Sequence, residues 1–221
     1  MLNYDTFQIA WLGHDGFKII FTKNGEQKTI YIDPYQLSES SKKAHDADLV
    51  LISHNHYDHL SLDDIQEILK SDTKILASAE CEEKLSTLPH ELKGAVPGDK
   101  LTIQEVPVEI VPAYNTNKRF HPKADEKVGF VIVLEKYRIY HAGDTDMIPE
   151  MEFTKPDVAL VPVSGTYVMN SEEAAKATNE IIKPTKFVVP MHYGTIVGSE
   201  KDAMNFRDLV KVCETKILNK D

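Results

Sequence analysis

Four side chains of the kind that bind transition metals fall close together in the sequence, in the segment Ser53-His54-Asn55-His56-Tyr57-Asp58-His59-Leu60. His54 and His56 are one residue apart, so in an extended chain their imidazoles point the same way. Asp58 and His59 follow where the chain must turn. Imidazole nitrogen suits zinc, iron and manganese, and a carboxylate suits the harder of these metals. This spacing predicts a transition-metal site, but one cluster does not fill the coordination shells of two ions.

Three further candidate ligands lie near strand-like apolar runs elsewhere in the chain. Asp144 follows the run at 138–140, His192 follows the run at 187–189, and His121 lies in Phe120-His121-Pro122. In α/β proteins, ligand sites form beyond the carboxyl ends of the strands. We expect these residues to supply the ligands that the first cluster lacks.

The elements that must position these residues alternate between strands and helices. Residues 17–21 and 29–32 flank Asn24-Gly25 and predict a β-hairpin. The all-apolar run 49–52 predicts a buried strand that ends just before the histidine cluster. Further strands are expected at 74–77, 108–111, 129–133, 138–140, 158–161 and 187–189.

Three helices are expected from apolar residues at helical spacing. The first follows the cluster and covers 62–69, with Ser61 as its N-cap and Asp64 completing a capping box. The others cover 171–182, where Lys183-Pro184 stops the pattern, and 201–212. Strands and helices in this order predict an α/β sandwich.

Composition limits the remaining possibilities. A chain of 221 residues without a linker fits one domain, 1–221. The net charge of −10 opposes nonspecific binding to nucleic acid or an anionic membrane. Without an apolar run of roughly 18 residues or a signal segment, a cytoplasmic protein is expected. Cys81 and Cys213 are too isolated to indicate a disulfide framework or a thiolate zinc site, and we expect two reduced thiols.

Five segments together resemble one known family: Leu12-Gly13-His14, Tyr31-Ile32-Asp33-Pro34, Ser53 through His59, Tyr140-His141-Ala142-Gly143-Asp144-Thr145 and Pro190-Met191-His192-Tyr193-Gly194. The sequence resembles the metallo-β-lactamase superfamily, and within it the ascorbate-phosphate-lactonase-like branch of small metal-dependent hydrolases. The resemblance covers nearly the whole chain. It implies a four-layer αββα sandwich of two similar halves, with a dinuclear site along the edge between them.

The resemblance also implies ligand roles. His54 and His56 would bind one metal, Asp58 and His59 the second, Asp144 would bridge them, and His192 would complete the second site. The family pattern puts a third histidine for the first metal soon after a strand, where this chain reads Val111-Pro112-Ala113-Tyr114-Asn115. We favour His121 on a looped excursion; Tyr114, Asn115 or His14 are the alternatives.

Other residues are candidates for contacts around the metals. His14 would line the pocket or cap a turn, Asp33 would orient a ligand histidine or only make an Asp-Pro turn, and His141 would support the ligands from behind or pack. The basic group Lys118, Arg119 and Lys123 suggests capture of a phosphate or carboxylate, or is a solvated loop. Another pocket wall would contain Ser164, Thr166, Tyr167 and Met169, whereas surface positions without a role are expected for His45 and His90.

These features predict metal-assisted hydrolysis of a small ester, lactone or phosphoester by a hydroxide that bridges two divalent ions. Zn²⁺ is favoured, with Mn²⁺ or Fe²⁺ as alternatives. Asp58 and Asp144 are the expected catalytic carboxylates. No Gly-x-Ser-x-Gly elbow is present, so a covalent serine route is not expected.

Three other functions compete with this hypothesis. Nucleases or phosphodiesterases of the superfamily usually add a clamp domain or basic exosite, for which this acidic chain has no room. Redox chemistry at iron would need metal identification and oxygen-consumption assays to test. A noncatalytic metal or ligand sensor would hold one metal or none. The expected partner is a small, anionic substrate rather than a membrane or nucleic acid; a homo-oligomer is compatible with the branch.

Overall fold

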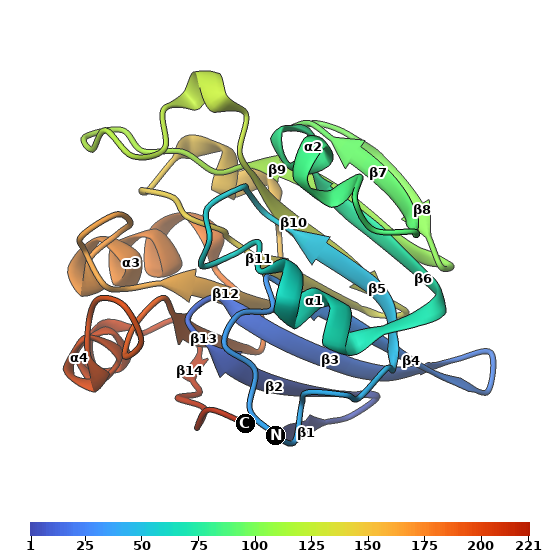
Figure 1. The fold of residues 1–221 in the computed structure, drawn as a ribbon. Coiled ribbons are helices and arrows are strands. Elements are labelled where there is room, and N and C mark those ends of the chain that lie inside the picture. The colour runs from blue at the N-terminus through green and yellow to red at the C-terminus, as the bar shows by residue number, and fades with distance from the viewer. The chain divides into compact units, whose positions relative to one another are not determined.

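A computed structural model of the protein describes residues 1–221 and divides them into two compact units (Figure 1). The first unit contains Met1–Ala95 and Leu218–Asp221, and the second contains Val96–Ile217. The last residues join the first unit because the Asp221 N–H donates to the carbonyl of Trp11 (2.9 Å). Each unit is built on one seven-stranded sheet. That the whole chain folds as one domain stays a prediction.

The first unit has its strands side by side in chain order: β1 (Leu2–Tyr4), β2 (Phe7–Gly13), β3 (Gly16–Lys23), β4 (Glu26–Ile32), β5 (Ala47–Ile52), β6 (Leu69–Ser78) and β7 (Glu91–Ala95). The strands from β1 to β4 pair antiparallel, and those from β4 to β7 pair parallel. Helix α1 (Leu62–Ile68) connects β5 to β6. The turn η1 (Ala79–Cys81) and helix α2 (Glu82–Leu85) connect β6 to β7.

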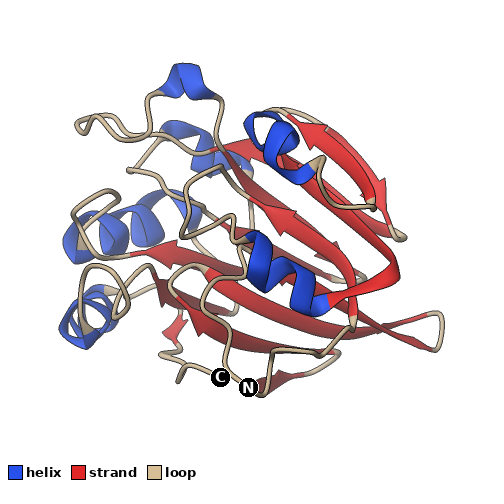
Figure 2. Cartoon of the chain, in the orientation of Figure 1, coloured by secondary structure: helices blue, strands red, loops and turns tan.

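The second unit repeats this plan with β8 (Lys100–Ile103), β9 (Val106–Pro112), β10 (Val128–Leu134), β11 (Tyr137–His141), β12 (Val158–Pro162), β13 (Phe187–Met191) and β14 (Glu214–Thr215). The strands from β8 to β11 pair antiparallel, and those from β11 to β14 pair parallel. Its helical segments are η2 (Lys123–Asp125), η3 (Pro149–Phe153), α3 (Ser171–Ala177), η4 (Thr178–Ile182) and α4 (Glu200–Leu209). Figure 2 shows that strands dominate the regular structure.

The parallel strands explain where polar residues gather. Antiparallel strands are joined by tight turns, such as Asn24-Gly25 between β3 and β4, whereas parallel strands need a crossover that returns the chain to the same edge. The carboxyl ends of β4, β5 and β6 therefore share one edge of the first sheet, and those of β11, β12 and β13 share one edge of the second. Candidate ligands follow strands at both edges.

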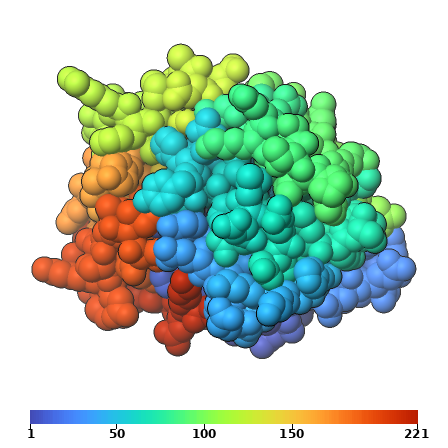
Figure 3. Space-filling view, viewed as in Figure 1, coloured from blue at the N-terminus to red at the C-terminus, as the bar shows by residue number.

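The central strands form the core of each unit. Every residue of β5, β12 and β13 is buried, as expected for strands covered on both faces. In the first unit, α1 packs Ile65 and Ile68 into a cluster that includes Leu12, Tyr31 and Val50. In the second, α4 packs Ala203 and Phe206 inward; Figure 3 shows α4, in red, at the surface.

The structure confirms the predicted hairpin, the predicted strands and the α/β class. It also confirms Ser61 as N-cap of α1, where its hydroxyl accepts from the Asp64 N–H. The Asp64 carboxylate does not close the capping box, because it accepts from the N–H groups of Gln36 and Leu37 instead. The helix predicted over 201–212 ends at Leu209, since Val210 is extended.

Five strands were not predicted: the short edge strands β1, β7, β8 and β14, and the longer strand β2. The four edge strands are short and partly exposed and lack the apolar runs used to find strands, whereas β2 contains the apolar run 9–12, which was not assigned to a strand. Both cysteines are free, as expected, and burial, together with the nearby Glu214 charge, raises the pKa of Cys213 to about 11. No helix has the length and apolar character to cross a bilayer.

Candidate metal centre

The loop after β5 brings together the imidazoles of the first unit. His54 Nε2 lies 3.0 Å from His56 Nδ1, and the ring centroids of His54 and His59 are 3.9 Å apart. The loop turns where the N–H groups of His59 and Leu60 both donate to the carbonyl of His56 (3.1 and 2.8 Å). This turn places three imidazoles from six residues of chain in contact.

The connection between β6 and β7 fixes this loop from the side. The Asn55 N–H donates to the Glu80 carboxylate (3.0 Å), and Lys84 Nζ donates to the Asn55 carbonyl (2.6 Å). These two contacts hold the backbone between the candidate ligands His54 and His56.

Asp33, directly after β4, orients two of these imidazoles. Its fully buried carboxylate accepts from the His59 ring at Nδ1 (2.8 Å) and from the Ser53 hydroxyl (2.5 Å). The Ser53 oxygen in turn lies 3.0 Å from His54 Nδ1. Because an ionised carboxylate only accepts hydrogen bonds, this network places protons on both Nδ1 atoms and leaves the Nε2 lone pairs for a metal.

The tight turn between β2 and β3 adds two more buried groups. His14 Nε2 lies 3.1 Å from Asp58 Oδ2, and Asp15 Oδ2 lies 3.9 Å from His59 Nδ1. Both side chains are fully buried. Asp15 was not among the predicted site residues, although its place beside His14 in a Gly-x-x-Gly turn is a signal that the sequence carries.

Asp144 is the centre of the second unit's candidate ligands. Its Oδ2 atom lies 3.4 Å from His121 Nε2 and 3.2 Å from His192 Nε2. All three side chains are almost fully buried, with at most 3% of the residue exposed. A carboxylate oxygen between two imidazole nitrogens, away from water, is the environment expected for a metal ligand.

His121 reaches Asp144 because its long loop folds back onto β9. The Asn115 N–H donates to the His121 carbonyl (2.7 Å), and the His121 N–H donates to the Asn115 side chain (3.1 Å). Buried Asp146 closes the same loop by accepting from the Thr116 N–H (2.8 Å) and from the Lys118 ammonium. The displaced histidine thus returns to the strand end, as the looped excursion required.

Tight backbone turns position the other two ligands. His192 directly follows β13 in a left-handed conformation (φ 60°), and its Nδ1 lies 2.8 Å from the Ser164 hydroxyl. Gly143 has φ +63°, and a Cβ there would lie 2.7 Å from the Val128 carbonyl. The His141 ring accepts from the Gly143 N–H (3.2 Å), so it shapes the turn that carries Asp144.

The alternatives to His121 have other partners. The Tyr114 hydroxyl donates to Glu150 (2.9 Å), and burial with this hydrogen bond raises the pKa of Tyr114. The Asn115 amide donates to the Tyr167 carbonyl (2.9 Å). Both side chains are engaged in these contacts, and His14 lies beside Asp58 (3.1 Å).

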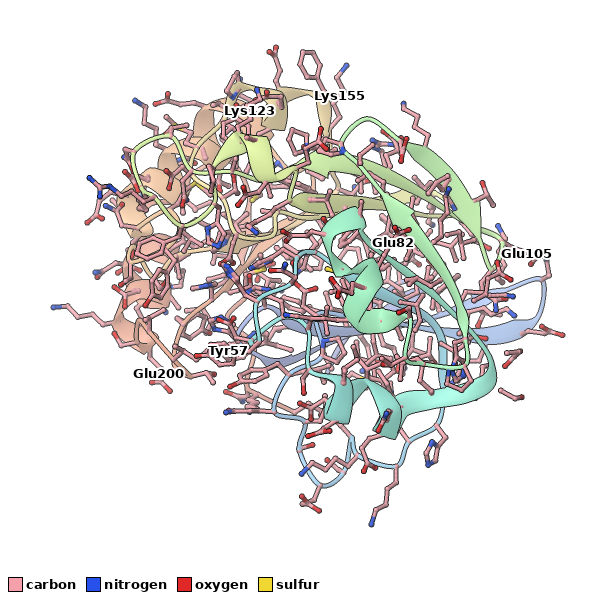
Figure 4. The ribbon with its side chains drawn as sticks, turned by 45° about the horizontal axis from the view of Figure 1, so that its top comes forward. Tyr57, Glu82, Glu105, Lys123, Lys155 and Glu200 are labelled. Carbon is pink, nitrogen blue, oxygen red and sulfur yellow. The ribbon has the colours of Figure 1, made fainter.

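The basic group around His121 is largely engaged. Lys118 pairs with Asp146 and with Glu173 (3.8 Å), and Lys123, labelled in Figure 4, pairs with Glu150 (2.7 Å). Arg119 is exposed. Substrate binding by Lys118 or Arg119 therefore stays a prediction, and the structure gives both lysines a part in holding the loop.

The donor chemistry fits divalent transition metals. In the first unit, His14, Asp58 and His59 offer ligand atoms within 4.8 Å of one another. Nitrogen donors with one carboxylate suit zinc, manganese or iron, and the second unit offers the same types around Asp144. Two such sets, one in each unit, are consistent with a site for two ions.

Comparison with known proteins gives the family. Residues 8–192 match the model described as the beta-lactamase superfamily domain. A UPF0173 metal-dependent hydrolase of Staphylothermus marinus is 32% identical over 219 residues, covering 92% of this chain and 90% of its relative. The chain belongs to the UPF0173 metal-dependent hydrolase family.

Solved structures show the same fold as this UPF0173 chain. A Parabacteroides distasonis protein of 32% identity has a TM-score of 0.81 and shares 96% of this chain and 94% of its own. The metallo-beta-lactamase fold protein YhfI of Bacillus subtilis has a TM-score of 0.72 at 14% identity, covering 97% and 96%. These comparisons confirm the predicted metallo-β-lactamase fold and the predicted superfamily. They also confirm the predicted enzyme class, a metal-dependent hydrolase.

Proposed function

We propose that this UPF0173 protein hydrolyses a small ester, lactone or phosphoester with two divalent metal ions. The observation that carries the proposal is that each unit places buried imidazoles around a carboxylate, Asp58 in one and Asp144 in the other. His54, His56 and His121 would serve one ion, and Asp58, His59 and His192 the other, with Asp144 bridging.

The bound ions would supply the chemistry that the side chains lack. They would lower the pKa of a bound water to about 7 and would polarise the substrate oxygen. Zn²⁺ is our first choice, and Mn²⁺ or Fe²⁺ suit the same mixed donors.

The chain's own residues prepare the donors. Asp33 and Ser53 fix the rings of His54 and His59, and Ser164 fixes the ring of His192. Fixed rings present their Nε2 atoms without reorganisation, which preserves affinity and geometry together. His14, in contact with Asp58, would hold that carboxylate in the orientation that hydrolysis needs.

The substrate remains a proposal within the ascorbate-phosphate-lactonase-like branch. A small molecule fits a protein of this size and charge better than a nucleic acid or a membrane, because a net charge of −10 repels both. An anionic group on the substrate would have exposed Arg119 as a candidate partner. We further propose a cytoplasmic protein and leave homo-oligomerisation to measurement.

Metal content and hydrolysis measured on the same samples test this function. Wild-type protein should carry about two ions per chain and hydrolyse lactones, phosphodiesters or phosphotriesters in a screen with each metal. His54→Ala should lose metal and activity together. His90→Ala is the matched control, since His90 contacts the Lys70 carbonyl (3.1 Å) far along the chain from the ligands.

The outcomes separate the competing functions. Full activity and two ions in His54→Ala would contradict the mechanism. One ion or none in the wild type, without hydrolysis, would support a sensor, and preference for phosphodiesters would support the phosphodiesterase alternative.

A further inference from the structure

In the first unit, aromatic rings lead from a buried histidine to the surface. The centroid of the fully buried His14 ring is 6.5 Å from that of Tyr35, which is 5.9 Å from that of Tyr57. Tyr35 is half-buried and Tyr57 is 64% exposed. Tyr57, labelled in Figure 4, stands between His56 and Asp58 on the candidate metal loop.

The second unit repeats this arrangement with different elements. The centroid of the fully buried His192 ring is 6.5 Å from that of Tyr167, which is 4.6 Å from that of Phe120. Tyr167 is half-buried and Phe120 is 50% exposed. Phe120 directly precedes His121, so its exposed ring also stands one residue from a candidate ligand.

Ordinary packing does not explain these exposed rings. A ring that contributes to a core is removed from water, but Tyr57 and Phe120 keep half or more of their surface accessible. Both stand beside candidate ligands in separate units, and each is supported by a half-buried tyrosine. In the free protein, these rings expose apolar surface to water, which is unfavourable. A ligand that covers the rings would remove this surface from water and so gain binding free energy.

The geometry favours a planar aromatic ligand over an aliphatic one. Both pairs are edge-to-face, with interplanar angles of 77° and 87°. Such a pair presents one electron-rich ring face and one positive ring edge to a third ring. An aromatic ligand can place its own positive edge against the face, or its own face against the edge. A saturated group would gain only from the area that it buries.

The two lysines near His121 do not offer an equally direct alternative, and exposed Arg119 stays the candidate partner of an anionic group on the substrate. Lys118 and Lys123 are engaged by Asp146 and Glu150. The rings are therefore better placed than the lysines to recognise the part of the substrate that lies outside the metals.

We propose that the Tyr35–Tyr57 pair and the Phe120–Tyr167 pair each offer a surface that binds a planar aryl group, and that the substrates of this protein are aryl-bearing esters or lactones. The inference rests on the proposed hydrolase function for the bond that is cleaved. Recognition of the aryl group itself needs no hydrolysis, so the two can be tested apart.

Binding of two non-hydrolysable ketones to the metal-loaded protein tests the proposal. Acetophenone and cyclohexyl methyl ketone differ only in the ring, and saturation-transfer NMR with titration gives both dissociation constants. Wild-type protein should bind acetophenone roughly 3- to 10-fold more tightly, the range expected for a favourable aromatic pair. Tyr57→Ala and Phe120→Ala should each reduce this preference, and the double variant should abolish it.

Phe153→Ala is the matched control, because Phe153 is 71% exposed on η3 and lies away from the candidate ligands in sequence. It should keep the aryl preference. The same variants should lower kcat/KM for benzoate esters more than for cyclohexanecarboxylate esters.

Equal binding of the two ketones, no binding of either, or a preference that survives both ring removals would each overturn the proposal. Aryl preference without hydrolysis of any ester would instead contradict the proposed function and leave aryl recognition standing. Hydrolysis of both ester series at equal rates, together with equal affinities for the two ketones, would support the proposed function and contradict aryl recognition.

Discussion

The two units share one strand order but supply their candidate ligands differently. In the first, one loop after the fifth strand, β5, carries His54, His56, Asp58 and His59. In the second, the three candidate ligands follow the second, fourth and sixth strands: His121 after β9, Asp144 after β11 and His192 after β13. The same strand order can therefore place its candidate ligands in one loop, as in the first unit, or in three separate loops, as in the second.

Corresponding positions of the two sheets carry related residues with different tasks. An aspartate follows the fourth strand in both, Asp33 after β4 and Asp144 after β11. Asp33 contacts ring Nδ1 of His59, whereas Asp144 contacts ring Nε2 of His121 and His192. A serine follows the fifth strand in both, and Ser53 and Ser164 each contact a histidine Nδ1. Both units thus support a histidine ring through its Nδ1 atom, but only in the second unit is the fourth-strand aspartate itself a candidate ligand.

Asp144→Asn should have the largest effect on this comparison. The amide keeps the shape but removes the charge that two cations would share, so we expect loss of at least one ion per chain and a fall in kcat/KM of roughly 100-fold or more. Metal analysis by mass spectrometry and kinetics on the best ester measure both. Normal metal content would mean that Asp144 is not a ligand.

Asp33→Asn should have a smaller effect at the corresponding position. It leaves the Nε2 donors in place but weakens the orientation of His59 and of the Ser53 hydroxyl that supports His54. Metal affinity should fall roughly 10- to 100-fold, and added metal should restore most of the activity. If Asp33→Asn is as damaging as Asp144→Asn and metal does not rescue it, the distinction between the two aspartates is wrong.

The candidate ligands of the first unit could be predicted from the sequence more directly than those of the second. The cluster after β5 could be found from sequence because its members are consecutive and follow a buried strand. His121 could only be proposed as a ligand, because its position depends on how its loop folds back onto β9. That fold depends on hydrogen bonds of Asn115 and Asp146, which the spacing of residues in the sequence does not predict. The resemblance supplied the roles of Asp144 and His192.

Other residues were hidden because their role depends on burial. Asp15 looks like a turn residue in sequence, and only the structure shows its carboxylate buried near His59. Lys118 looks like a free cation, and only the structure shows that Asp146 engages it. The central strands were predictable from apolar runs, whereas edge strands such as β8 depend on pairing with a neighbour, which is a tertiary effect.

The smallest predicted effect is a change in the free energy of unfolding, and it tests whether the two units unfold together. Glu109 on β9 pairs with Arg138 on β11 (2.9 Å), and the hydrogen bond from this guanidinium holds the carboxyl pKa below its usual value of 4.5 despite partial burial. A lowered folded-state pKa adds stability above pH 4.5 that is lost as the pH falls through the folded-state value. Since both side chains are partly exposed, Glu109→Gln should cost about 1 kcal/mol or less at pH 7 and nearly nothing at pH 3.

The only tryptophan, Trp11, lies in the first unit and the substitution lies in the second. If the chain unfolds as one domain, urea transitions followed by Trp11 fluorescence and by circular dichroism should shift together at pH 7. Glu214→Gln, on an exposed side chain paired with Lys216, is the control and should shift neither. A shift in circular dichroism alone would show that the second unit unfolds separately, and would contradict the prediction of a single domain over residues 1–221.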